Sequence, residues 1–165
     1  MSRTLSVRRR PRTRPLDTRL LRRVALWALH DALGLQHYEL GIHLVGATTM
    51  ARINETYLGH PGSTDVITFD HGPGPGPGAR PHSAPMLQGE IFICLDDAVA
   101  QARRFRTTWT EEVVRYLLHG LLHLRGFDDL APAARRVMKR EENRLVRAAA
   151  RAFPLQRLAR PARRP

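Results

Sequence analysis

Apolar and polar positions alternate along the chain with two periods, one typical of helices and one typical of strands. Helical spacing is clearest in residues 16–33, where Leu20, Val24, Trp27 and Ala28 share one face. Gly34 follows as a stop signal. A period of two marks residues 38–45 as a strand, and short apolar stretches predict two more strands at 65–69 and 90–95.

The remaining helices are predicted from their capping residues and apolar spacing. They run from Thr48 or Thr49 to about Tyr57, from Asp96 or Asp97 to about Phe105, from Thr108 to Leu124, and from Pro132 to about Ala150 with Val137, Met138, Glu141, Leu145 and Val146. In the helix that Thr108 caps, Glu111 and Glu112 occupy the first turn, where the helix dipole favours acids. The order of elements predicts an α+β fold, a small mixed sheet with helices packed mainly on one side.

Residues 71–85 are dominated by glycine and proline, which do not support regular structure. Both flanks of this segment are predicted strands of one sheet, so we interpret it as a flexible loop within a domain and not as a domain boundary. The length of 165 residues suits one domain, which we place at residues 15–153.

The net charge of +12 is concentrated near the two ends of the chain. Residues 1–14 contain six arginines and residues 151–165 contain five, with no acid in either segment. We therefore predict basic flexible tails at 1–14 and 154–165, of the kind that bind RNA or ribosomes by releasing counterions. A general preference for arginine, with tails that are simply solvated, is the alternative.

The cysteine content and the start of the chain bear on where the protein acts. Cys94 is the single cysteine, so no internal disulfide forms, and a packed thiol in a reducing cytoplasm is expected. The basic start is not followed by an apolar stretch typical of a signal peptide or membrane span, although an arginine-rich transit peptide stays a lesser alternative. The prediction is a cytoplasmic protein without membrane contact.

Two histidines four positions apart are the strongest candidates for chemistry. His119 and His123 project from one face of the predicted helix, and Gly126 can end that helix and reverse the chain. Asp129 could then supply a third ligand, and three protein ligands with one open position are typical of catalytic zinc. Asp128 is a rival, which we place as an outer partner that orients a histidine or closes the turn. The alternative is a buried histidine pair that hydrogen-bonds to the backbone.

The residue that follows the first histidine excludes one kind of enzyme. Metallopeptidases with an H-E-x-x-H helix use the glutamate as general base, and this chain has Gly120 at that position. Glycine can neither accept nor deliver a proton. A peptidase mechanism of that kind therefore lacks its base.

Residues 119–129, His-Gly-Leu-Leu-His-Leu-Arg-Gly-Phe-Asp-Asp, resemble the signature of the rRNA maturation RNase YbeY family, H-G-x-L-H-L-x-G-[YF]-D-H. Residues 53–69 and 88–94 are similar to two further blocks of that family, in the same order. Asp129 replaces the histidine usual at the third ligand, which makes the set harder and more anionic. Leu58 stands where many members have an arginine, and His60 is a candidate replacement for that group or a plain loop histidine.

The resemblance implies a sheet of about four strands with the metal-bearing helix against it. It also implies one Zn(2+) per chain, or another divalent ion, and no small-molecule cofactor. The implied activity is single-strand-specific endoribonuclease cleavage in rRNA maturation, at the 3′ end of small-subunit rRNA, and in ribosome quality control, with rRNA and the small subunit as partners. Thr64 and Asp65 either line the cleft or cap a turn. A metal-dependent peptidase and a non-enzymatic ribosome-associated factor with a structural metal stay open as alternatives.

Overall fold

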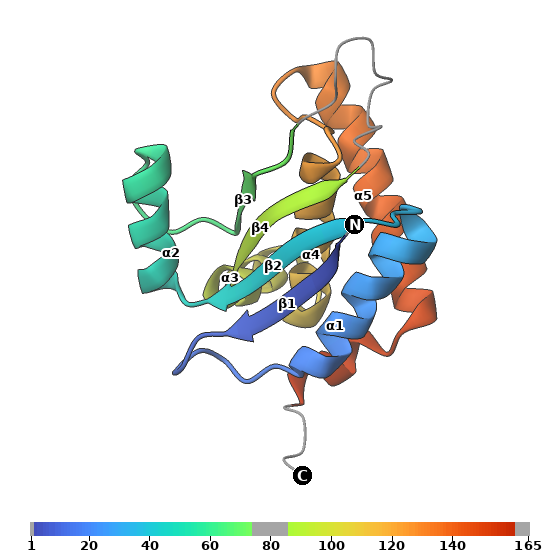
Figure 1. Ribbon diagram of the computed structural model, residues 1–165. Coiled ribbons are helices and arrows are strands. Elements are labelled where there is room, and N and C mark those ends of the chain that lie inside the picture. The colour runs from blue at the N-terminus through green and yellow to red at the C-terminus, as the bar shows by residue number, and fades with distance from the viewer. Residues whose placement is uncertain (1, 74–85, 161–165) are drawn as a thin grey trace.

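Four strands form one mixed sheet in a computed structural model that describes residues 2–73 and 86–160 (Figure 1). The strands are β1 (Arg3–Arg9), β2 (Tyr38–Val45), β3 (Val66–Asp70) and β4 (Leu87–Cys94). They lie in the order β1-β2-β4-β3, in which β1, β2 and β4 are parallel and β3 runs antiparallel to β4. The α-helices are α1 (Thr18–Trp27), α2 (Ala47–Ile53), α3 (Leu95–Phe105), α4 (Trp109–Leu124) and α5 (Pro132–Ala152), and π-helical turns at Ala28–Ala32 and Asn54–Leu58 continue α1 and α2. The predicted α+β class with a four-stranded mixed sheet is confirmed.

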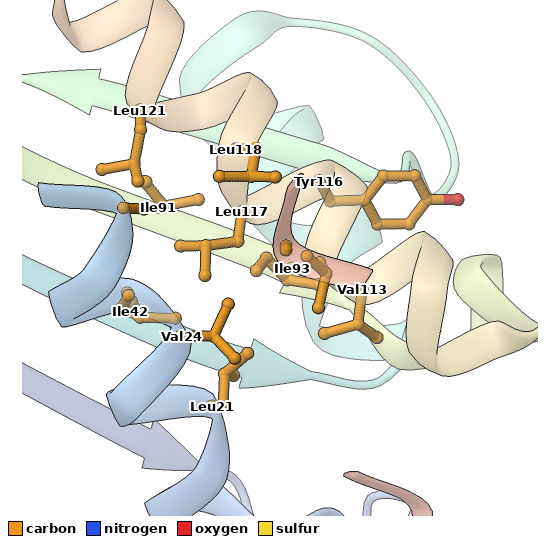
Figure 2. Close-up of a cluster of buried hydrophobic side chains, with 14 of the residues drawn as sticks. Leu21, Val24, Ile42, Ile91, Ile93, Val113, Tyr116, Leu117, Leu118 and Leu121 are labelled. Carbon is orange, nitrogen blue, oxygen red and sulfur yellow. The ribbon is translucent and has the colours of Figure 1, made fainter. Parts of the chain in front are cut away.

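The main core lies between one face of the sheet and the helices α1, α4 and α5. Period-two alternation directs Leu40, Ile42 and Leu44 of β2 to this face, where they are almost fully buried. Figure 2 shows side chains from α1 and α4 meeting those of β2 and β4 in this layer. A smaller hydrophobic cluster on the opposite face of the sheet includes Met50 of α2 and Ile67 of β3. Helix α2 therefore lies apart from the other helices in Figure 1.

The predicted N-terminal tail is wrong, because residues 3–9 form the edge strand β1. Arg3 pairs with Tyr38 and the register continues to Arg9 opposite Leu44, parallel to β2. Leu5 is 7% exposed in the core, and Val7 packs against it, while the arginines of the strand stay at the surface. The charge suggested disorder, but the short apolar alternation of Leu5 and Val7 suffices when a neighbouring strand is available to pair with.

The C-terminal tail boundary is also wrong. Residues Leu155–Ala159 form a short 3-10 helix after α5, and Leu158 is fully buried in the main core. The amide of Asp17 donates to the carbonyl of Leu158, which ties this turn to the start of α1. The domain therefore extends on both sides of 15–153, and residues 161–165 lie outside the described part of the chain.

Helix starts depend on residues that are distant in sequence as well as on local caps. Thr108 caps α4 as predicted, and its hydroxyl accepts from the amide of Glu111 at 3.2 Å. By contrast, α2 begins at Ala47 and not at Thr48 or Thr49, because the carboxylate of Asp96 accepts the Ala47 amide at 2.7 Å. Because the capping residue is distant in sequence, the residues around the start of α2 do not reveal it.

The glycine- and proline-rich segment connects neighbouring strands. β3 and β4 flank it and pair with each other in the sheet. Residues 71–73 have no regular structure, and the prediction of a flexible loop for 74–85 falls outside the described residues. None of the helices in the described ranges is both long and apolar enough to cross a membrane.

Candidate metal centre

Helix α4 presents His119 and His123 on one face, and its close packing against the sheet depends on Gly120. A Cβ atom at position 120 would lie 2.9 Å from two carbons of Ile91 on β4, closer than real side chains approach. The glycine therefore lets α4 press onto β4. A glutamate at this position would collide with Ile91, so the missing peptidase base has a structural reason.

The segment after α4 folds back so that a carboxylate reaches the two histidines. Gly126 has a φ of 98°, in the left-handed region that favours glycine, and its amide donates to the carbonyl of His123 at 2.9 Å. After this turn the Oδ2 atom of Asp129 lies 3.8 Å from Nε2 of His119 and 3.7 Å from Nε2 of His123. Within residues 2–73 and 86–160, His119, His123 and Asp129 form the only group of three or more histidine, cysteine, aspartate or glutamate side chains spaced to bind one metal ion.

Hydrogen bonds on the far side of each imidazole determine which nitrogen faces the cluster. Nδ1 of His119 is 2.9 Å from a carboxylate oxygen of Glu142, and Nδ1 of His123 is 3.1 Å from the carbonyl oxygen of Phe127. Because both oxygens accept hydrogen bonds, each neutral ring carries its proton on Nδ1 and leaves an Nε2 lone pair. This assignment follows from the hydrogen-bond partners.

The geometry of the three inward atoms fits a divalent ion. The two Nε2 atoms are 3.1 Å apart, and without a proton on either they repel unless a cation lies between them. Zinc–nitrogen distances of about 2.0–2.1 Å with tetrahedral angles place two ligand nitrogens about 3.3 Å apart. The Oδ2 atom of Asp129 lies 3.7–3.8 Å from the two Nε2 atoms, slightly more than this ligand–ligand distance, and Asp129 belongs to a loop. The donor set of two nitrogens and one oxygen leaves a fourth position open.

Glu142 on α5 is a candidate functional residue that the sequence analysis missed, because its carboxylate contacts His119. Its side chain is 5% exposed, and besides His119 it accepts from Arg115 at 3.0 Å and from Lys139 at 3.2 Å. Burial raises the pKa of this carboxyl, but hydrogen bonds from His119 and Arg115 and the charge of Lys139 outweigh it and lower the pKa to about 2. Glu142 is thus ionised at neutral pH and lies behind a candidate metal-ligand histidine, an arrangement that fixes the ring and raises its basicity.

The sequence offered only an indirect signal for this carboxylate. The buried face of α5 consists of Met138, Glu142, Leu145, Val146 and Ala149, so one acid interrupts an apolar stripe. Glu141, the acid singled out from the sequence, is partly exposed and pairs with Arg144.

The electrostatic environment of His123 also favours a ligand. Burial, together with the charge of His119, lowers its pKa, and the opposing effects of Asp129 and of the Phe127 carbonyl are smaller. A lower pKa keeps the ring neutral near pH 7. Only the neutral ring has a lone pair to bind a metal.

A pocket of about 460 Å³ opens over the cluster. Leu58 and Asp65 line it together with the three candidate ligands, whereas Thr64 and His60 are not part of its lining. His60 is exposed on the loop after α2, so the structure does not bring it to the cluster. Asp65 lines the pocket and also accepts from the amide of Val66 at 2.8 Å, which combines the cleft and turn roles.

Asp128 is not part of the metal-spaced group of His119, His123 and Asp129. It is exposed, and its Oδ1 accepts from the amide of Leu130 at 2.6 Å. Of the two roles considered for it, this contact corresponds to closing the turn. The orienting role belongs to Glu142 and to the carbonyl of Phe127.

Comparison with known proteins gives one consistent result. A family model described as Endoribonuclease YbeY matches residues 10–150. The Endoribonuclease YbeY of Salinibacter ruber is 36% identical over 146 residues, 87% of this chain and 90% of that protein. The protein of the same name from Anaeromyxobacter sp. is 40% identical over 138 residues, 84% of this chain and 67% of that protein.

A solved structure supports the fold. The solution structure of TM1509 from Thermotoga maritima matches with a TM-score of 0.62 and 20% sequence identity, over 98% of this chain and 100% of that one. At this identity the likeness concerns the fold alone.

Proposed function

This chain belongs to the Endoribonuclease YbeY family, and we propose that it is a single-strand-specific, metal-dependent endoribonuclease of rRNA maturation. Its substrate in this proposal is the 3′ end of small-subunit rRNA, with a further role in ribosome quality control. The single observation that supports catalysis most directly is the convergence of two Nε2 atoms and one carboxylate oxygen in an open pocket.

We assign the metal to His119, His123 and Asp129, with Zn(2+) as the first choice because of the two nitrogen ligands. When bound there, a divalent ion would supply Lewis-acid chemistry, which lowers the pKa of water and stabilises charge on a phosphoryl group. The chain itself holds the ligands in position: Glu142 and the Phe127 carbonyl keep both rings in the required tautomer.

Proton transfer is assigned to a carboxylate of the pocket. With glycine at position 120 and His60 outside the lining, Asp65 and Asp70 are the acids that line the pocket besides Asp129. Asp65 is held at the start of β3 by the amide of Val66, so its position is defined. We propose that Asp65 accepts a proton from the attacking water.

The composition of the chain suits an RNA substrate. A net charge of +12 attracts a polyanion, and the arginines of β1 lie at the surface of a folded edge strand. Their fixed positions give the RNA a defined surface to follow. A peptidase is disfavoured because position 120 has no room for a general base.

The proposal is tested by cleavage of single-stranded RNA with purified protein and measured metal content. We expect about one divalent ion per chain and cleavage of single-stranded but not double-stranded RNA. His123→Ala should abolish both metal retention and cleavage, with the fold and RNA affinity preserved. Cleavage that survives in metal-free His123→Ala protein would contradict the assignment, and metal content without any RNase activity would favour a non-enzymatic factor.

A further inference from the structure

A second pocket adjoins the pocket over His119, His123 and Asp129. It has a volume of about 580 Å³ and lies between α3, α4 and α5. Asp65, Val66 and His119 line both pockets, so the two hollows meet at a metal-ligand histidine and at the start of β3. A polymer whose reactive bond lies at the metal can therefore extend directly into the second pocket.

Two polar groups in the lining of this pocket have no hydrogen-bond partner. The hydroxyl of Tyr116 and Oε1 of Gln101 are both buried, and within the described residues neither makes a hydrogen bond. Tyr116 is 4% exposed, and Figure 2 shows its ring directed away from the other labelled core side chains. Buried groups of this kind are costly when left unsatisfied, so an unpaired donor and an unpaired acceptor in the lining of one pocket point to a missing ligand.

The outer wall of the pocket carries an exposed aromatic ring and an unpaired cation. Phe105, at the end of α3, is 60% exposed, and the guanidinium of Arg104 lies 5.3 Å from the centre of its ring. Arg104 has no carboxylate within ion-pair distance in the described part of the chain. An exposed ring with a cation beside it is the combination that proteins use to stack a base and neutralise a phosphate of single-stranded nucleic acid.

We propose that this pocket is a subsite for the nucleotide next to the scissile phosphate. Its base stacks on Phe105, its polar edge reaches Gln101 and Tyr116, and its phosphate lies near Arg104. The proposal rests on the ribonuclease function proposed above, and it adds the path that the single-stranded RNA takes from the metal site. Every base offers an aromatic face and a donor–acceptor edge, so the subsite favours single strands without requiring one base.

The charges and chemistry of the pocket favour a nucleotide over a purely anionic or apolar ligand. Arg115 and Lys139 are paired with Glu142, and the lining also contains Asp65 and Glu112, so among the described residues Arg104 is the cation of the lining without an ion pair. A free phosphate would find only one unpaired cation there. A nucleotide uses the stacking surface and the two unsatisfied polar groups as well.

The test compares Phe105→Ala and Arg104→Ala with the matched control Arg103→Ala, which changes the neighbouring exposed arginine outside this pocket. Metal-loaded protein cleaves a single-stranded RNA oligonucleotide with a mapped cleavage site, and two further sets of substrates are shortened stepwise from the 5′ or the 3′ end. The affinity of metal-stripped protein for the same fluorescein-labelled oligonucleotides is measured by anisotropy.

We expect Phe105→Ala to weaken oligonucleotide affinity and kcat/KM by about 5- to 150-fold, the range for loss of one stacked base. Arg103→Ala should behave as wild type. In one of the two shortened sets the difference between Phe105→Ala and wild type should disappear at the length that no longer reaches the pocket. An equal loss at every length, or no loss, would overturn the subsite.

Tyr116→Phe provides a second check that does not depend on exposed residues. Because the hydroxyl has no partner in the free protein, its removal should leave the thermal unfolding midpoint unchanged or higher, yet weaken oligonucleotide affinity by about 2- to 10-fold. Unchanged affinity would contradict the proposed contact. A wild-type protein that cleaves no RNA would overturn the proposed function and the subsite together, whereas normal cleavage and binding by the Phe105 and Arg104 variants would overturn the subsite alone.

Discussion

Glu142→Gln removes one negative charge from behind the metal centre while keeping the size and shape of the side chain. In the native protein one carboxylate accepts from His119, Arg115 and Lys139. A glutamine has one acceptor oxygen and presents an NH2 group to the remaining donors. Either His119 or Arg115 therefore loses its acceptor in this variant.

The magnitude follows from the lowered pKa of Glu142. A pKa of about 2 against an ordinary value of 4.5 corresponds to a preference of about 3 kcal/mol for the charged form, at about 1.4 kcal/mol per unit. Neutral pH lies above both values, so this stabilisation is fully present there. Glutamine recovers part of it by hydrogen bonding. We expect the metal-free variant to lose about 1–3 kcal/mol in free energy of unfolding.

The effect on metal binding is separate and has its own magnitude. Without the carboxylate, the ring of His119 is less basic and its tautomer is no longer fixed, so metal affinity should fall about 10- to 100-fold. Competition with a chromophoric chelator measures the affinity, and urea unfolding of metal-free protein measures the stability.

Glu141→Gln is the matched control for this experiment. It changes the neighbouring acid on the same helix, which pairs with Arg144 at the surface and does not contact the histidines. Exposed pairs contribute little, so stability and metal affinity should stay near wild type. If Glu142→Gln bound metal as tightly as Glu141→Gln, the carboxylate would not orient His119 and the reasoning would be refuted.

Three further changes test the packing and the ligand set. Gly120→Ala should lower the free energy of unfolding by about 1–3 kcal/mol through its clash with Ile91, and Ile91→Val in the same chain should recover part of the loss in urea unfolding. Leu5→Ala should cost about 2–4 kcal/mol because β1 is part of the core, whereas the exposed Thr4→Ala should cost little; equal midpoints for the two would restore the flexible-tail hypothesis. Asp129→Ala should lose most of the metal affinity in the chelator assay and Asp129→His should retain metal, while an Asp129→Ala protein that kept its metal would remove this residue from the ligand set.

The local pattern predicted the elements that have strong signals of their own. The apolar spacing of α4, its Thr108 cap and the glycine after it are all contained in one continuous segment, and the structure places them as predicted. The two histidines and Asp129 belong to the same segment, so their proximity needed only helix geometry and one turn. This is why the candidate ligands could be found before the fold was known.

Where pairing or capping comes from distant residues, the sequence pattern was insufficient. Arg3–Arg9 has a charge pattern typical of a disordered tail, and it becomes a strand only because β2 offers an open edge and the core accepts Leu5. The start of α2 depends on Asp96, 49 positions away. The residues close in sequence to β1 or to the start of α2 do not indicate these distant partners.

The sequence alone therefore determined the α+β class from the order of its elements, and it determined the helix and the three side chains of the candidate metal site because these lie within one short segment. The tertiary structure decided which nitrogens face the candidate metal site and which pockets adjoin it. Both depend on α5, since it brings Glu142 to His119, 23 residues away, and closes the second pocket against α3 and α4. A carboxylate on one helix can fix a histidine on another only after the chain has packed, and packing is a property of the whole sequence.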